Sequence, residues 1–165
     1  MKLEEVGSGQ AVFVDANVFI YHLTGRSGAC RGLLFRCEAG EVQGLTGAHV
    51  VLEVLHRLMM LEAVQRASVS PGNVARRLKE RPEVVRVLGE YARHASRIPD
   101  MGIRMLPVDG GLVRASHEVR TRAGLLVHAS ISVAMMEQQG MKAIATQDKD
   151  FLRVDGLQVY TADDI

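Results

Sequence analysis

Residues 11–17 read AVFVDAN, a run of four apolar residues that ends at Asp15. A short apolar run bounded by polar or turn residues is typical of a buried strand. Further strands are expected at residues 42–46, 103–106, 143–146 and 157–160. Between them, helical patterning covers residues 30–39, 48–66, 71–97, 111–122 and 130–139. Strands that alternate with helices predict βαβ units, and therefore an α/β fold with a parallel sheet covered on both faces.

Length and composition are those of an ordinary globular chain. The 165 residues are 47% hydrophobic and 24% charged, which suffices for a hydrophobic core and excludes intrinsic disorder as the main state. No linker, repeat or low-complexity tract divides the sequence, so we expect a single domain over residues 1–165. The net charge of +1 excludes a uniformly basic nucleic-acid-binding surface but is compatible with a local basic patch.

The sequence also predicts the compartment of the protein. No apolar run approaches the roughly 18 residues that would span a bilayer. The first residues, MKLEEVGSGQ, contain two glutamates where a signal peptide would carry positive charge. Cys30 and Cys37 lie two turns apart in one predicted helix, roughly 10 Å, which is too far for a disulfide. We therefore expect a reduced, cytoplasmic protein.

Two acidic residues follow predicted strands, Asp15 after the first and Asp148 after the fourth. Ligands bind beyond the carboxyl ends of the strands in parallel sheets, so both carboxylates are expected at one site. Like charges held close together need a proton or a cation between them, and oxygen ligands favour Mg²⁺ or Mn²⁺ over zinc. Alternatively, both residues are helix N-caps or turn residues, as aspartate often is after a strand.

Glu53 is a third acidic candidate. It lies in VVLEVL, within a helix that is apolar around most of its circumference. A buried carboxylate without a partner is costly, so Glu53 should face a cleft or a cation. The alternative is a narrow solvent-facing stripe shared with His49, His56 and Arg57, which lie three or four residues away.

Four stretches of the sequence together resemble a known family. They are VFVDANVFIYHL, LTGAHVVLEVLHRL, GLLVHASISVAMMEQQG and IATQDKDF, and the likeness extends over residues 12–159. The sequence is similar to a PIN domain, in particular to a VapC-type toxin ribonuclease of a type II toxin–antitoxin system. This resemblance implies a three-layer α/β/α sandwich with a central parallel sheet. It also implies a metal-dependent endoribonuclease that hydrolyses RNA phosphodiester bonds.

The resemblance assigns roles to individual residues. Asp15, Glu53 and Asp148 match the catalytic carboxylates of the family, which hold one or two Mg²⁺ or Mn²⁺ ions. Three further residues are implied in supporting roles on the substrate side: Asn17, Thr146 and Asp150.

One catalytic position, Ala129, departs from the family pattern. An aspartate that serves as a principal metal ligand is usual there, and this sequence has alanine after His128. Alanine offers no oxygen, and imidazole is a poor ligand for Mg²⁺ though acceptable to Mn²⁺. The register is shifted, the site is naturally degenerate, or the carboxylate was removed by substitution. We favour removal, because the flanking match is clean, and expect an inactive or nearly inactive chain that still binds RNA.

A basic segment provides a candidate RNA-binding surface. Residues 64–97 carry eight Lys or Arg against three Glu, a net charge of +5 in a chain of +1. Contacts to phosphates from such a segment would supply affinity without sequence choice. The alternative is a solvated amphipathic face. The cations are Arg66, Arg76, Arg77, Lys79, Arg81, Arg86, Arg93 and Arg97.

Protein partners are implied by the resemblance alone. The family forms homodimers and is inhibited by a VapB-type antitoxin that occupies a groove near the acidic site. Methionine-containing stripes at residues 58–61 and 135–136 are expected in the core, with a dimer or partner surface as the alternative.

Two other functions compete with the nuclease. Asp15-Ala16-Asn17 loosely resembles the nucleophile motif of haloacid-dehalogenase-like phosphatases, but that family has an aspartate where this sequence has Asn17. A degenerate, non-catalytic PIN domain that binds RNA or a protein is the other alternative, and Ala129 favours it. Restoring an aspartate at position 129 distinguishes a disabled nuclease from a natural binding module.

Overall fold

A five-stranded parallel sheet forms the centre of the protein. The computed structural model describes residues 1–66 and 69–165. The strands run in the order β3-β2-β1-β4-β5, and all four neighbouring pairs are parallel, as predicted. Their bounds are β1 Ala11–Val14, β2 Gln43–Gly47, β3 Ile103–Leu106, β4 Ala143–Ala145 and β5 Gln158–Tyr160.

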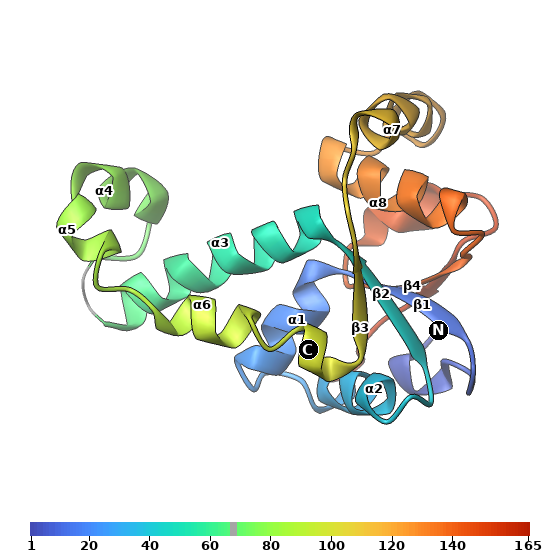
Figure 1. Cartoon of the computed structure of the whole chain (residues 1–165), viewed down its shortest axis with the longest axis horizontal. Coiled ribbons are helices and arrows are strands. Elements are labelled where there is room, and N and C mark those ends of the chain that lie inside the picture. Colours follow the sequence, from blue (N-terminus) through green and yellow to red (C-terminus); the bar gives the residue numbers. More distant parts are fainter. Residues whose placement is uncertain (67–68) are drawn as a thin grey trace.

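Helices cover both faces of this sheet (Figure 1). The connections from β1 to β2 and from β2 to β3 lie on one side, whereas α7 and α8 lie on the other, which confirms the predicted α/β/α sandwich. The α-helices are α1 Ala16–Leu23, α2 Gly28–Glu38, α3 Ala48–Gln65, α4 Val74–Glu80, α5 Pro82–Val85, α6 Glu90–Ala95, α7 Gly110–Ala123 and α8 Val127–Gln138. Three short 3-10 helices are η1 Leu3–Glu5, η2 Pro99–Met101 and η3 Lys149–Arg153.

The strand order places a crevice between β1 and β4. From β1 the chain moves outward to β2 and β3, then crosses back to β4 on the other side of β1. Such a reversal of strand order is where α/β sheets bind ligands, beyond the carboxyl ends. The two strands are also the most deeply buried: Val12, Phe13, Val14, Ile144 and Ala145 are each 0% exposed. The crevice is therefore built on the most deeply packed part of the sheet.

The structure differs from the predicted helices in several local details. The helical patterning over residues 71–97 corresponds to three helices, α4, α5 and α6, because Pro82 starts a new helix and Gly89 precedes another. Pro71 begins the predicted helical segment, a position that favours proline at a helix start, but α4 begins only at Val74. Helix α8 begins at Val127, three residues earlier than expected, and α1 was not predicted.

A second, smaller cluster of buried side chains lies beside the main core. The main cluster surrounds the sheet, whereas the smaller one consists of Ala63, Val69, Leu78, Val84 and Leu88. We call residues 69–89 the outer lobe; Figure 1 shows its helices α4 and α5 at the far end of α3. Whether residues 1–165 form a single domain stays a prediction.

Two predictions from composition can be compared with the structure. Cys30 and Cys37 are both buried in α2 and both free, as expected. No helix within residues 1–66 and 69–165 has the length and apolarity needed to cross a membrane.

Candidate functional site

Asp15 and Thr146 connect the ends of the two central strands. Val14 of β1 pairs in register with Ala145 of β4, so the next residue of each strand lies at the same edge. The Thr146 hydroxyl donates to Asp15 Oδ2 at 2.6 Å, and the Asn17 side-chain amide donates to the same oxygen at 2.7 Å. The Asn17 amide also contacts the Thr146 hydroxyl at 3.1 Å. These contacts fix one Asp15 oxygen firmly.

Asp15 stands at the N-cap position of α1, but its side chain makes no capping hydrogen bond. The N-cap interpretation thus accounts for its position and not for its side-chain contacts. Burial raises the pKa of Asp15, and the charges of Glu53 and Asp148 raise it further, against the opposing bond from Thr146. The three carboxylates therefore act on one another across the site.

Asp148 does behave as a turn residue. Its Oδ1 accepts a hydrogen bond from the backbone N–H of Asp150 at 2.9 Å and so caps η3. Its own N–H donates to the Thr146 hydroxyl at 3.0 Å, and its side chain is exposed. Asp150 instead pairs with Arg153 at 2.8 Å. The turn interpretation and a site at this edge are both compatible with Asp148.

Glu53 reaches the same edge from the second turn of α3. Its side chain is 33% exposed and lies 3.8 Å from Arg57 and 3.6 Å from His128 Nδ1. The predicted polar stripe is thus partly right, because His56 and Arg57 are on the accessible side of the helix, where Arg57 is 65% exposed. It is wrong for His49, which is 7% exposed.

His49 and Ser132 were not identified from the sequence as a pair. His49 Nε2 lies 2.9 Å from the Ser132 hydroxyl, which also donates to the His128 carbonyl at 3.3 Å. Burial lowers the pKa of His49 to about 4, and the charge of His128 adds to this. His49 is therefore a neutral link between α3 and α8 at physiological pH. Its only sequence signal was its spacing of four residues from Glu53.

These elements enclose one large groove, with a volume of about 1370 Å³. Asp15, Asn17, Glu53, Asp148 and Ala129 all line it, so the structure brings five of the predicted site residues together. Two others do not line it: Thr146 lies beneath Asp15, and Asp150 turns to Arg153.

The three carboxylates have a charge that suits a divalent cation, but their arrangement does not form a complete binding site. Three carboxylates offer oxygen ligands, which suits Mg²⁺ or Mn²⁺. Within the described part of the chain, however, no three His, Cys, Asp or Glu side chains lie close enough to share one ion. Ala129 supplies no oxygen, and Glu53 lies toward Arg57 and His128. As they stand, the residues present do not complete a metal site.

The comparison with known families is decisive about ancestry. A sequence model of the PIN domain matches residues 12–157. The chain belongs to the PIN domain family. The PIN domain resemblance seen in the sequence is confirmed, and membership of this family is incompatible with the haloacid-dehalogenase-like alternative.

Relatives of this PIN domain agree with the VapC-type resemblance. The chain is 26% identical over 160 residues to Ribonuclease VapC2 of Methanocaldococcus jannaschii, covering 96% of each protein. Its fold matches VapBC2 of Rickettsia felis bound to a promoter DNA fragment (TM-score 0.59, 10% identity, 93% and 100% coverage). It also matches VapC20 of Mycobacterium tuberculosis, a toxin that cleaves the sarcin–ricin loop, with a TM-score of 0.56 and 17% identity over 86% of this chain and 92% of VapC20. A chain of a toxin–antitoxin complex from Klebsiella pneumoniae is also similar, with a TM-score of 0.55 and 17% identity over 93% of this chain and 98% of that chain.

Proposed function

We propose that this PIN domain is a VapC-type endoribonuclease, the toxin of a type II toxin–antitoxin system. The observation that carries the proposal is the convergence of Asp15, Glu53 and Asp148 on one groove at the carboxyl ends of β1 and β4. The likeness to Ribonuclease VapC2 over 96% of the chain supports ribonuclease rather than another activity. The reaction is hydrolysis of an RNA phosphodiester bond.

Asp15, Glu53 and Asp148 are the carboxylates that would hold a Mg²⁺ or Mn²⁺ ion in a site completed by a further carboxylate, since these ions suit carboxylate oxygens. Asn17 and Thr146 act by positioning Asp15, since both donate to its Oδ2. Ala129 lies where a further carboxylate is expected and leaves the site incomplete. This chain is therefore inactive or nearly inactive while its groove remains formed.

The antitoxin partner fits the rim of the same groove. Large apolar side chains are exposed there: Leu52 by 65%, Leu61 by 38%, Leu126 by 79% and Val127 by 54%. An exposed apolar rim is suited to a protein segment, and the structural neighbours include toxin–antitoxin complexes. We propose a VapB-type antitoxin as that partner, a homodimer as the free form, and the cytoplasm as the location.

A non-catalytic PIN domain is the second candidate, and Ala129 is the observation in its favour. Such a protein would bind RNA or a protein through the groove and hydrolyse nothing. A disabled nuclease should regain cleavage when a carboxylate is added at position 129, whereas a non-catalytic PIN domain should not.

Cleavage of a panel of structured RNAs with Mg²⁺ or Mn²⁺ separates the two. We expect no cleavage by the parent chain, cleavage by Ala129→Asp, and loss of that cleavage in EDTA. Ala129→Asn is the matched control, since it adds similar volume without a carboxylate, and it should stay inactive. Glu53→Gln in the Ala129→Asp background should abolish cleavage. Failure of Ala129→Asp to cut any RNA would favour the binding module.

A further inference from the structure

The outer lobe is a small, separately packed unit that borders the groove. Its buried residues pack on the end of α3, and the buried Glu62 carboxylate accepts hydrogen bonds from the N–H groups of Gly89 (3.1 Å) and Tyr91 (2.9 Å). Arg66 adds a contact of 3.1 Å to Glu62 and donates to the Val87 carbonyl. The lobe is therefore held in a fixed position on α3.

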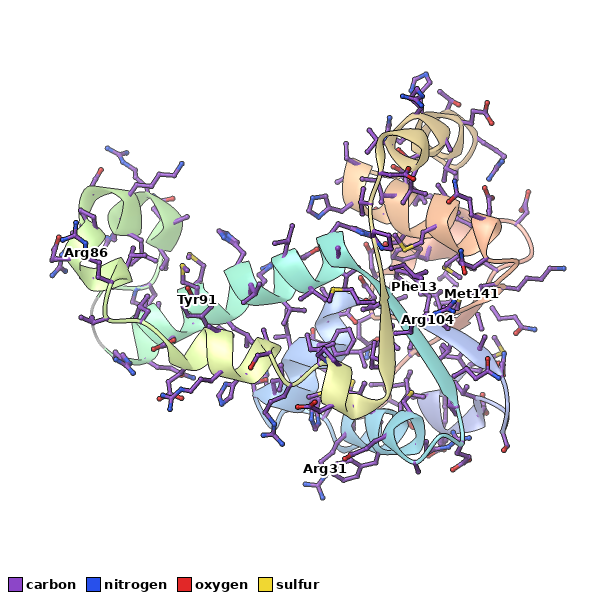
Figure 2. All side chains as sticks on the ribbon, viewed as in Figure 1. Phe13, Arg31, Arg86, Tyr91, Arg104 and Met141 are labelled. Carbon is purple, nitrogen blue, oxygen red and sulfur yellow. The ribbon has the colours of Figure 1, made fainter. Side chains whose placement is uncertain are left out.

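The lobe is basic, and its cations fall into two kinds. It contains five Lys or Arg against two Glu. Two arginines are paired: Arg76 with Glu80 at 3.1 Å, and Arg81 with Glu83 at 3.2 Å. In the described part of the chain no carboxylate lies within ion-pairing distance of the other three, which are all exposed: Arg77, Lys79 and Arg86. Figure 2 shows Arg86 on the outside of the lobe, away from the body of the protein.

The lobe and the carboxylates belong to the same groove. Pro71, Gly72 and Val74 of the lobe line it together with Asp15 and Glu53. Arg77 lies one turn after Val74, on the same side of α4. Glu53 and Val64 both line the groove and are separated by about 16 Å along α3, at 1.5 Å per residue. The groove thus extends from the carboxylates to the edge of the basic lobe, and the cations of the lobe lie beyond its lining.

An RNA backbone bound in the groove needs cations near it. The carboxylates repel its phosphates, and the cation nearest to Glu53, Arg57, is already beside that glutamate. Binding energy must therefore come from cations outside the acidic end, as phosphate contacts do in nucleic-acid-binding proteins generally. The chain has no Trp and is only 4% aromatic, so base stacking is a minor source.

We propose that the outer lobe grips the backbone of the RNA through Arg77, Lys79 and Arg86, beyond the cleavage site. This inference rests on the proposed function for its substrate. It assigns the lobe affinity and orientation of the RNA rather than chemistry. The paired residues Arg76 and Arg81 contribute little, because their charges are already balanced within the lobe.

Salt dependence of RNA binding tests the proposal. The probe is a fluorescein-labelled single-stranded RNA of about 20 nucleotides, bound to the full chain in EDTA so that no hydrolysis occurs, from about 50 to about 300 mM NaCl. We expect the slope of log Kd against log salt to fall by about 2 in Arg77→Gln/Lys79→Gln/Arg86→Gln, because each phosphate that is no longer neutralised lowers it by about 0.7.

Two control variants make the test specific to the lobe. Arg76→Gln/Glu80→Gln removes a paired cation without changing net charge and should leave the slope unchanged. Arg31→Gln/Arg114→Gln/Lys142→Gln removes three exposed cations away from the groove, Arg31 lying on α2 (Figure 2), and should also leave it unchanged. Circular dichroism should be used to check that each variant folds.

Three outcomes would overturn the proposal: no RNA binding by the parent chain, an equal fall of the slope in the remote triple variant, or competition by polyglutamate as effective as by unlabelled RNA. The last would identify an acidic protein as the occupant instead. Failure of the proposed function is distinguishable, because it would leave lobe-dependent RNA binding intact while Ala129→Asp cleaved nothing.

Discussion

The Thr146 hydroxyl donates a hydrogen bond of 2.6 Å to Asp15, across the junction of the two most buried strands of the sheet. The same hydroxyl oxygen accepts from the Asp148 N–H and from the Asn17 amide. Its hydrogen-bonding capacity, one donor and two acceptor positions, is therefore fully used. Thr146 is 0% exposed, so it acts as a support for the acidic site rather than as a group that touches a ligand.

Thr146→Val should therefore raise the pKa of Asp15 further, because the hydroxyl bond is a main influence that lowers it. The Asp148 N–H also loses its acceptor, and we expect a cost of about 2 kcal/mol in the free energy of unfolding. Carboxyl-detected NMR titration measures the pKa. Thr146→Ser keeps the hydroxyl and should leave the pKa of Asp15 unchanged; an equal rise in both variants would refute the supporting role.

Asp15→Asn should stabilise the protein at neutral pH by about 1 kcal/mol, a common result when a site charge is removed. Burial raises the pKa of Asp15, so ionisation costs more in the folded than in the unfolded chain. That cost is present above the folded pKa and vanishes below the ordinary value of about 3.9. Urea unfolding at pH 7 and at about pH 3 should show the gain only at pH 7.

His49 should make the protein acid-sensitive. Its pKa is about 4 in the folded chain against about 6.5 when unfolded, so protons bind preferentially to the unfolded state between these values. Stability therefore falls as pH drops through this window, by about 2 kcal/mol between pH 7 and pH 5. His49→Gln should flatten that dependence, and His117→Gln, on the exposed face of α7, should not. Identical pH profiles for both variants would contradict a buried neutral His49.

Glu62→Ala should loosen the outer lobe without disturbing the sheet. The N–H groups of Gly89 and Tyr91 would lose their acceptor, at a cost of about 2 kcal/mol. Glu62→Gln keeps one carbonyl oxygen and should cost about half as much. Hydrogen exchange should accelerate over residues 69–89 and stay slow in β1 and β4; uniform acceleration would mean that the lobe is not a separate unit.

The sequence predicted the sheet and the position of the site for identifiable reasons. Each strand is a short buried apolar run, and parallel pairing brings the residues that follow β1 and β4 to one edge. Asp15 and Asp148 could therefore be placed together from chain order alone. Glu53 could be identified as a candidate because it is a carboxylate in a helix that is apolar around most of its circumference.

Features of the site that depend on packing between distant segments could not be predicted from the sequence. His49 and Ser132 are separated by 83 positions, and only the approach of α3 to α8 reveals their contact. Local spacing suggested a solvent-facing position for His49, because spacing within α3 does not show that α8 covers this residue. Helix α1 was not predicted, and the helical patterning over residues 71–97 did not show that Pro82 and Gly89 divide this segment into three helices.

The two buried clusters meet along α3 and at Tyr91, which packs against both. A substitution in the outer lobe that leaves Tyr91 and α3 untouched should therefore have little effect on β1, β4 and the carboxylates between them, because sites without shared partners contribute to stability almost independently. Under selection, a chain built in this way can change the charge of its outer lobe, and with it the proposed affinity for RNA, while the carboxylates stay fixed. Such changes need involve only the roughly twenty residues of the lobe, 69–89.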